Sequence, residues 1–165
     1  MKAVYSRLTK LLGQPPEGII FSQFVAELGC EPIIDLPSYA IPALGVTLVV
    51  MDQLFSVVLI DIDTPSTRQG SISRYGADLP NAINQGDGPE TIEEKLSVRP
   101  FISKRPSVTG LNHKYFQDTY LLPPLVVVFE FAGDTEKLTS LAIGLSSEPH
   151  WAGYSILHNQ TARGS

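Results

Sequence analysis

The sequence predicts an α+β fold, namely an antiparallel sheet built from two helix–hairpin units with the helices packed on one face. Apolar residues recur at helical spacing in segments that end at glycine or proline. Runs of β-branched residues are separated by short polar turns, which is typical of hairpins. The same order of elements then occurs in both halves of the chain.

The length and composition favour one domain. The 165 residues and the hydrophobic fraction of 43% suit a single domain with its own core. This domain is expected to span residues 1–155. Residues 156–165 are expected to be a disordered tail or a cloning remnant.

Two amphipathic helices are expected near the N-terminus, over residues 3–12 and 19–28. Each has four apolar residues on one helical face: Val4, Leu8, Leu11 and Leu12 in the first, and Ile20, Phe24, Val25 and Leu28 in the second. Gly13 ends the first segment, and Gly29 offers a left-handed cap for the second. An extended, proline-punctuated stretch follows over residues 33–44.

Two hairpins are expected. Residues 46–51 and 55–62 form the first, with Asp52 and Gln53 between them, and residues 125–132 and 138–145 form the second. Residues 115–122 read as a further strand. The strands of the first hairpin are apolar on both faces, which predicts positions inside a covered sheet.

A third helix is expected from residue 89 to residue 96. Asp87 is the predicted N-cap and Pro89 lies in the first turn, while acidic residues suit the positive end of the helix. Its Leu-Ser-Val-Arg-Pro ending at residues 96–100 parallels Leu-Gly-Cys-Glu-Pro at residues 28–32. Residues 19–63 and 88–146 are therefore candidate repeat units, although glycine and proline follow helices in many α+β proteins.

The order of helix, Leu-Gly-x-Pro, extended segment and hairpin resembles the units of tandem helix–hairpin proteins of the beta-lactamase inhibitor protein type. The run YGADLPNAI at residues 75–83, with the short helix after it, resembles a phrase of bacterial polymorphic-toxin immunity proteins, Y-x-G-x-L-P-x-G-I/L. The chain departs from it at Ala82 and Ser97, which replace glycines, and at Pro100, one residue late. The resemblance spans about residues 20–145. It implies an immunity protein that blocks a cognate toxin from a competing cell.

No catalytic, metal or cofactor site is expected. The three histidines, His113, His150 and His158, lack metal-site spacing, and Cys30 is the only cysteine. A lone cysteine permits no intrachain disulfide, which fits a reducing compartment. The N-terminus lacks a signal-peptide pattern, and the longest apolar run, residues 43–51, is too short to span a bilayer. A cytoplasmic location is therefore expected.

The charge and the aromatic residues point to a protein partner. The net charge of −5 argues against a nucleic-acid binder and suits a basic partner, although it also serves solubility. Tyrosine and tryptophan are enriched in interface hot spots. The candidate partner-binding residues are Asp61, Asp63, Tyr75, Asp78, Asp118, Tyr120, Glu130 and Trp151.

Each candidate also has a structural interpretation. Asp61 and Asp63 could simply end a strand, Tyr75 and Tyr120 could seal the edge of the core, and Trp151 could pack back on the domain. The favoured hypothesis is a non-enzymatic immunity or inhibitor protein, a monomer or weak homodimer without nucleic-acid or membrane partners. The alternatives are a small enzyme or ligand-binding protein with an unrecognised site, and a structural adaptor subunit.

Overall fold

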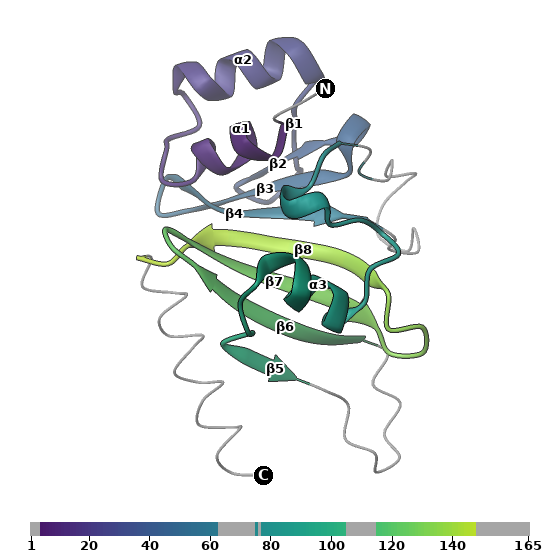
Figure 1. Cartoon of the computed structure of the whole chain (residues 1–165). Helices are drawn as coiled ribbons and strands as arrows, with labels where there is room; N and C mark the ends of the chain where they lie inside the picture. Colours follow the sequence, from purple (N-terminus) through teal and green to yellow (C-terminus); the bar gives the residue numbers. More distant parts are fainter. Residues whose placement is uncertain (1–3, 63–74, 76, 105–114, 148–165) are drawn as a thin grey trace.

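The computed structural model describes residues 4–62, 75, 77–104 and 115–147. Within these residues it confirms the α+β class, with three α-helices and one antiparallel sheet of eight strands (Figure 1). The helices are α1 (Val4–Leu11), α2 (Ile19–Leu28) and α3 (Pro89–Leu96). The strands are β1 (Glu31–Pro32), β2 (Ser38–Ile41), β3 (Val46–Met51), β4 (Leu54–Asp61), β5 (Ile102–Lys104), β6 (Tyr115–Leu122), β7 (Leu125–Ala132) and β8 (Leu138–Leu145), and the 3-10 turns are η1 (Pro42–Leu44) and η2 (Pro80–Ala82).

Both predicted hairpins are confirmed. In the β3–β4 hairpin, Asp52 and Gln53 have φ angles of 51° and 65°, the left-handed values that a two-residue turn between twisted strands requires. The β7–β8 pair is the second hairpin. Gly13 N–H donates to the carbonyl of Phe55 at 2.8 Å, so the segment after α1 is tied to the start of β4.

The two hairpins belong to one continuous sheet. Its strand order is β1-β2-β3-β4-β8-β7-β6-β5, and the centre is the antiparallel pair β4–β8. Asp61 lies opposite Ser140, and Val58 lies opposite Ile143. The last strand of each half therefore meets its counterpart at the middle of the sheet, and the first strands of each half form its edges.

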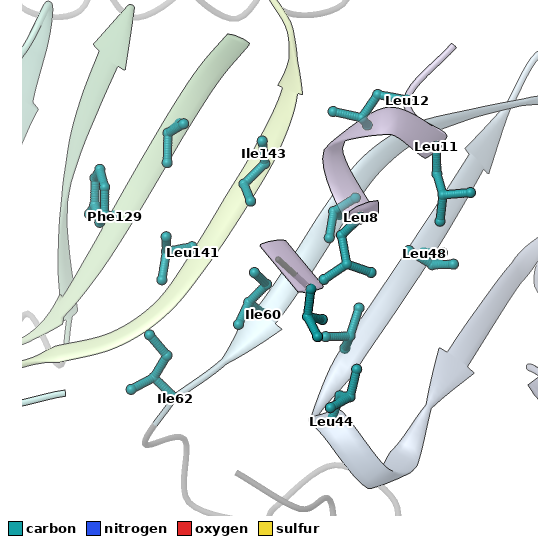
Figure 2. Packing of buried hydrophobic residues seen from close by; sticks show 14 of the residues in the cluster. Leu8, Leu11, Leu12, Leu44, Leu48, Ile60, Ile62, Phe129, Leu141 and Ile143 are labelled. Atoms are coloured by element: carbon teal, nitrogen blue, oxygen red, sulfur yellow. The ribbon is translucent and has the colours of Figure 1, made fainter. Parts of the chain in front are cut away.

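The main core lies on one face of this sheet. All three helices contribute buried side chains to a single cluster that also contains alternate residues of the central strands. Figure 2 shows Leu8 and Leu11 of α1 close to Leu48 and Ile60, with Phe129, Leu141 and Ile143 continuing the cluster across the neighbouring strands. The described helices therefore cover the same face.

The start of α3 differs from the prediction, because Asp87 is not its N-cap. Gly88 holds that position without a side-chain hydrogen bond. The Asp87 carboxylate is buried and accepts hydrogen bonds from Lys95 Nζ at 2.6 Å and from the backbone N–H of Asn84 at 2.9 Å. Lys95 Nζ also donates to the carbonyl of Ala82 at 2.7 Å. A buried carboxylate gains more from this ammonium group than from a helix end.

Ala82 and Ser97 adopt left-handed backbone conformations, with φ angles of 55° and 54°. These are two of the positions at which the immunity-protein pattern has glycine. Ser97 is the C-cap of α3, and Gly29 occupies the same position in α2 with a φ of 69°. The backbone keeps the shape that glycine favours, although this chain carries a Cβ at both sites.

We expect Ala82→Gly and Ser97→Gly each to raise the free energy of unfolding by about 0.5–1 kcal/mol, because glycine removes the left-handed strain. Urea denaturation of the single variants measures the change. Gly29→Ala is the reverse control and should destabilise by about 1 kcal/mol, since a Cβ at Gly29 would meet no atom within 4 Å and only the backbone term changes. A loss of stability in both glycine variants would contradict the strain argument.

Candidate partner-binding surface

The eight predicted partner-binding residues do not form one surface. Asp63 and Trp151 lie outside the described residues. Asp118 and Tyr120 are only 1% and 0% exposed, so the prediction that they contact a partner directly is wrong. Asp61, Tyr75, Asp78 and Glu130 remain accessible to different degrees.

Asp118 and Tyr120 are buried because of the alternation along β6. Phe116, Asp118 and Tyr120 lie opposite Phe131, Phe129 and Val127 on the helix-covered face. The Tyr120 ring packs edge-to-face on Phe129 with centroids 5.4 Å apart. Ser103 Oγ donates to Asp118 Oδ1 at 2.5 Å, so this carboxylate belongs to a buried polar contact between β5 and β6.

Asp61 and Glu130 are brought together on the opposite face of the sheet. Both lie opposite Ser140 of β8, Asp61 from β4 and Glu130 from β7. Two strand spacings separate their backbones, about 10 Å. Glu130 accepts hydrogen bonds from Ser140 Oγ and Gln117 Nε2, each at 3.2 Å, which hold the carboxylate in a fixed orientation.

We call this opposite surface the second face. It is lined by alternate residues of four strands: Val57, Leu59 and Asp61 of β4, Ser140 and Ala142 of β8, Val126, Val128 and Glu130 of β7, and Gln117, Thr119 and Leu121 of β6. Val126, Val128, Val57 and Ala142 form a small apolar cluster of their own. Leu59 and Leu121 are 37% and 44% exposed, whereas Val126 and Val128 are each only 5% exposed. The second face is therefore apolar, with two carboxylates along one margin.

Tyr75 and Asp78 lie apart from the second face. Tyr75 packs against the helix-side core, its N–H donates to the carbonyl of Asp61 at 3.0 Å, and its hydroxyl donates to the carbonyl of Asp78 at 3.2 Å. Burial raises the pKa of Tyr75 to about 12, and the charge of Asp78 and the nearby Tyr5 add to the rise. Burial also raises the pKa of Tyr5 to about 12. Tyr75 thus covers the edge of the core, as in the structural alternative to its predicted role in partner binding.

A groove that the sequence did not predict runs beside α3. Its volume is about 490 Å³, and it is lined by Glu90, Glu93, Glu94, Ser97, Val98 and Arg99. Arg99 Nε lies 3.8 Å from Glu93 Oε1, a long and exposed ion pair. The sequence identified these glutamates only as acidic residues suited to the start of α3, and their spacing did not predict a groove.

The described side chains offer little for metal or thiol chemistry. Among them, no group of three or more histidine, cysteine, aspartate or glutamate residues has an arrangement that could hold a metal ion. Cys30 is half-buried, and burial raises the pKa of its thiol to about 11. In the same part of the chain, no helix has the length and apolar character needed to cross a bilayer.

Comparison with known proteins gives no family. No family model and no curated protein matches the chain. Its fold is similar to part of a solved structure, an extracellular protein containing a SCP domain from Bacillus anthracis str. Ames, with 11% sequence identity and a TM-score of 0.48. The alignment covers 83% of this chain and 45% of that protein, so the chain spans less than half the length of its structural neighbour.

Proposed function

We propose that this chain is an immunity or inhibitor protein that binds a cognate toxin or effector and blocks its active site. The second face carries the proposal. The solvated face of an antiparallel sheet normally carries polar residues, whereas the second face has valines, leucines and an alanine across four strands. Leu59 and Leu121 are its exposed apolar residues, and they lie around the buried Val126 and Val128. Such a surface suits burial against another protein, and no cofactor is required.

The partner is expected to be basic. Asp61 and Glu130 border the apolar area, and the whole chain has a net charge of −5. Carboxylates at the margin of an interface accelerate the encounter with a positively charged surface and penalise wrong partners. A toxin acting on nucleic acid or on another anionic substrate has such a surface around its active site. The cytoplasm is the compartment in which an immunity protein would meet it.

The two halves of the chain are proposed to be copies of one helix–hairpin unit. Each has a helix with a left-handed C-cap, at Gly29 and at Ser97, then a short edge strand and a second strand, and then a hairpin. The strand order, which runs inward from both edges to β4 and β8, supports this relation. Two units that share one sheet bury more apolar surface than either hairpin does alone.

The edges of the sheet favour this function over the adaptor alternative. β1 has two residues and contains Pro32, and β5 has three residues and contains Lys104. Short edge strands with proline or lysine discourage the edge-to-edge pairing through which a sheet would recruit further subunits. Binding through a face of the sheet is the mode that the described strands support better.

Reversing both marginal charges, Asp61→Lys with Glu130→Lys, is expected to slow association with a basic partner about tenfold at low salt, with a smaller effect at high salt. The partner is first identified by a pull-down from the source cell together with a test of the protein encoded by the neighbouring reading frame. A one-to-one complex with a protein that is toxic when expressed alone supports the proposal. Stopped-flow kinetics then measures the rate.

The matched control is Glu17→Lys with Glu27→Lys, which changes the net charge equally at two exposed positions before and within α2, on the helix-covered side of the sheet. A second pair, Asp61→Asn with Glu130→Gln, removes the charges while Glu130→Gln keeps a hydrogen-bonding side chain. Equal slowing by the control pair would show that only net charge matters. Unchanged association with lowered stability in the reversal variant would assign these carboxylates to the fold and end the second-face proposal.

A further inference from the structure

We propose that the groove beside α3 is a second docking site, which binds a short basic segment of a partner protein with apolar residues between its cationic ones. The groove lies next to α3, and α3 packs into the main core on the helix-covered side of the sheet. It is therefore separate from the second face, and its occupancy does not depend on what the second face binds.

The size and the lining of the groove fit a peptide. A volume of about 490 Å³ accommodates a few side chains and lies within the range of ordinary ligand clefts. Val98, which lines the groove, is 43% exposed, and Phe101, three residues further on, is 52% exposed. The exposed valine gives the groove an apolar anchor point, and the exposed phenylalanine that follows in the chain offers a second one at its end, since aromatic residues contribute strongly to protein interfaces.

The charge of the groove indicates a basic occupant. Three carboxylates line it, and a single cation, Arg99, opposes them. Glu90 lies in the first turn of α3, where the positive helix end stabilises an acidic side chain. Glu94 lies only two residues before the C-terminal end at Leu96, where a carboxylate faces the negative helix end. Helix stability thus accounts for Glu90 but not for Glu94, and complementarity to a basic segment accounts for both.

Arg99 acts as an internal competitor for this site. Its guanidinium group lies 3.8 Å from Glu93, too far for a strong ion pair, and its side chain is almost fully exposed. A lysine or arginine of a bound segment would take the place of Arg99 at Glu93. Removing Arg99 should therefore tighten binding, whereas a groove that is only a solvated helix surface would show no such gain.

The test is fluorescence anisotropy on the full chain with a short, fluorescein-labelled peptide of alternating lysine and leucine. We expect saturable binding that weakens with added salt, a loss of about three- to tenfold in Glu93→Gln with Glu94→Gln, and a gain of about two- to fivefold in Arg99→Ala. Val98→Ser with Phe101→Ser should also weaken binding. These side chains are on the surface, and circular dichroism verifies that each variant is folded.

Two controls separate a site from general charge attraction. Glu17→Gln with Glu31→Gln removes the same charge elsewhere, and a lysine–serine peptide lacks the apolar side chains. The proposal is overturned if the lysine–leucine peptide does not saturate, if the control variant loses as much affinity as the groove variant, or if Arg99→Ala leaves the affinity unchanged. Equal affinity for the lysine–serine peptide would also overturn the proposal, because it would show that the apolar side chains do not contribute to binding.

Discussion

Replacing Tyr120 with alanine is expected to lower the free energy of unfolding by about 3–5 kcal/mol, the cost typical of removing a large buried aromatic ring. Tyr120 has no exposed surface and belongs to the main core on the helix-covered face. Its ring contacts Phe129 edge-to-face, and a truncation would leave a cavity between β6 and β7. For an ordinary domain this is a large share of the total stability.

The neighbouring residue provides the control. Leu121 points to the second face and is 44% exposed, so Leu121→Ala is expected to change stability by no more than about 0.5 kcal/mol. Urea denaturation followed by circular dichroism compares the two variants. A stable Tyr120→Ala protein would mean that β6 has its faces reversed, and it would return Tyr120 to the candidate interface.

Lys95→Met is expected to destabilise the protein by about 2–4 kcal/mol. The variant leaves the Asp87 carboxylate buried without its ammonium partner, and breaking a buried ion pair from one side is costly. It also removes the hydrogen bond from Lys95 Nζ to the carbonyl of Ala82, so η2 loses a tie to α3. The remaining bond from Asn84 N–H keeps the cost below that of a fully isolated charge.

A double-mutant cycle separates the pair from its surroundings. Asp87→Asn combined with Lys95→Met should recover part of the loss, because no unpaired charge stays buried. Lys10→Met on the exposed side of α1 is the control for removing a lysine and should be nearly neutral. Additive effects of Asp87→Asn and Lys95→Met would show that the two side chains do not interact, contrary to the 2.6 Å contact.

The fold was predictable where local signals agree. Gly29 and Pro32 end α2 as expected, and Asp52 with Gln53 turns the first hairpin. Contacts between residues far apart in the chain were harder to predict from the sequence. No local pattern specifies that Asp61 lies opposite Ser140, because strand pairing depends on which apolar faces meet in the folded chain. The predicted N-cap role of Asp87 was wrong for a related reason, because its partner Lys95 lies eight residues further along the chain and no local pattern pairs the two.

The candidate surface was predictable only in part. Asp61 and Glu130 share a face because each lies directly opposite Ser140, one from β4 and the other from β7. The sequence alone does not predict this, because it does not give the order of the strands in the sheet. Tyr120 and Asp118 were expected to be accessible because tyrosine and aspartate side chains usually keep at least part of their surface exposed. Here the alternation along β6 turns both toward the core, and the hydrogen bond from Ser103 makes the buried carboxylate tolerable.

The antiparallel pair β4–β8 at the centre of the sheet makes each half of the chain structurally incomplete. The residues that it joins, such as Asp61 and Ser140, are about eighty positions apart, so this seam closes a long loop, whereas the two hairpins close short ones. Two fragments separated between the halves would each keep a hairpin but expose β4 or β8 as a long apolar edge. The chain is therefore suited to fragment complementation, in which formation of the β4–β8 pair indicates that the two fragments have associated.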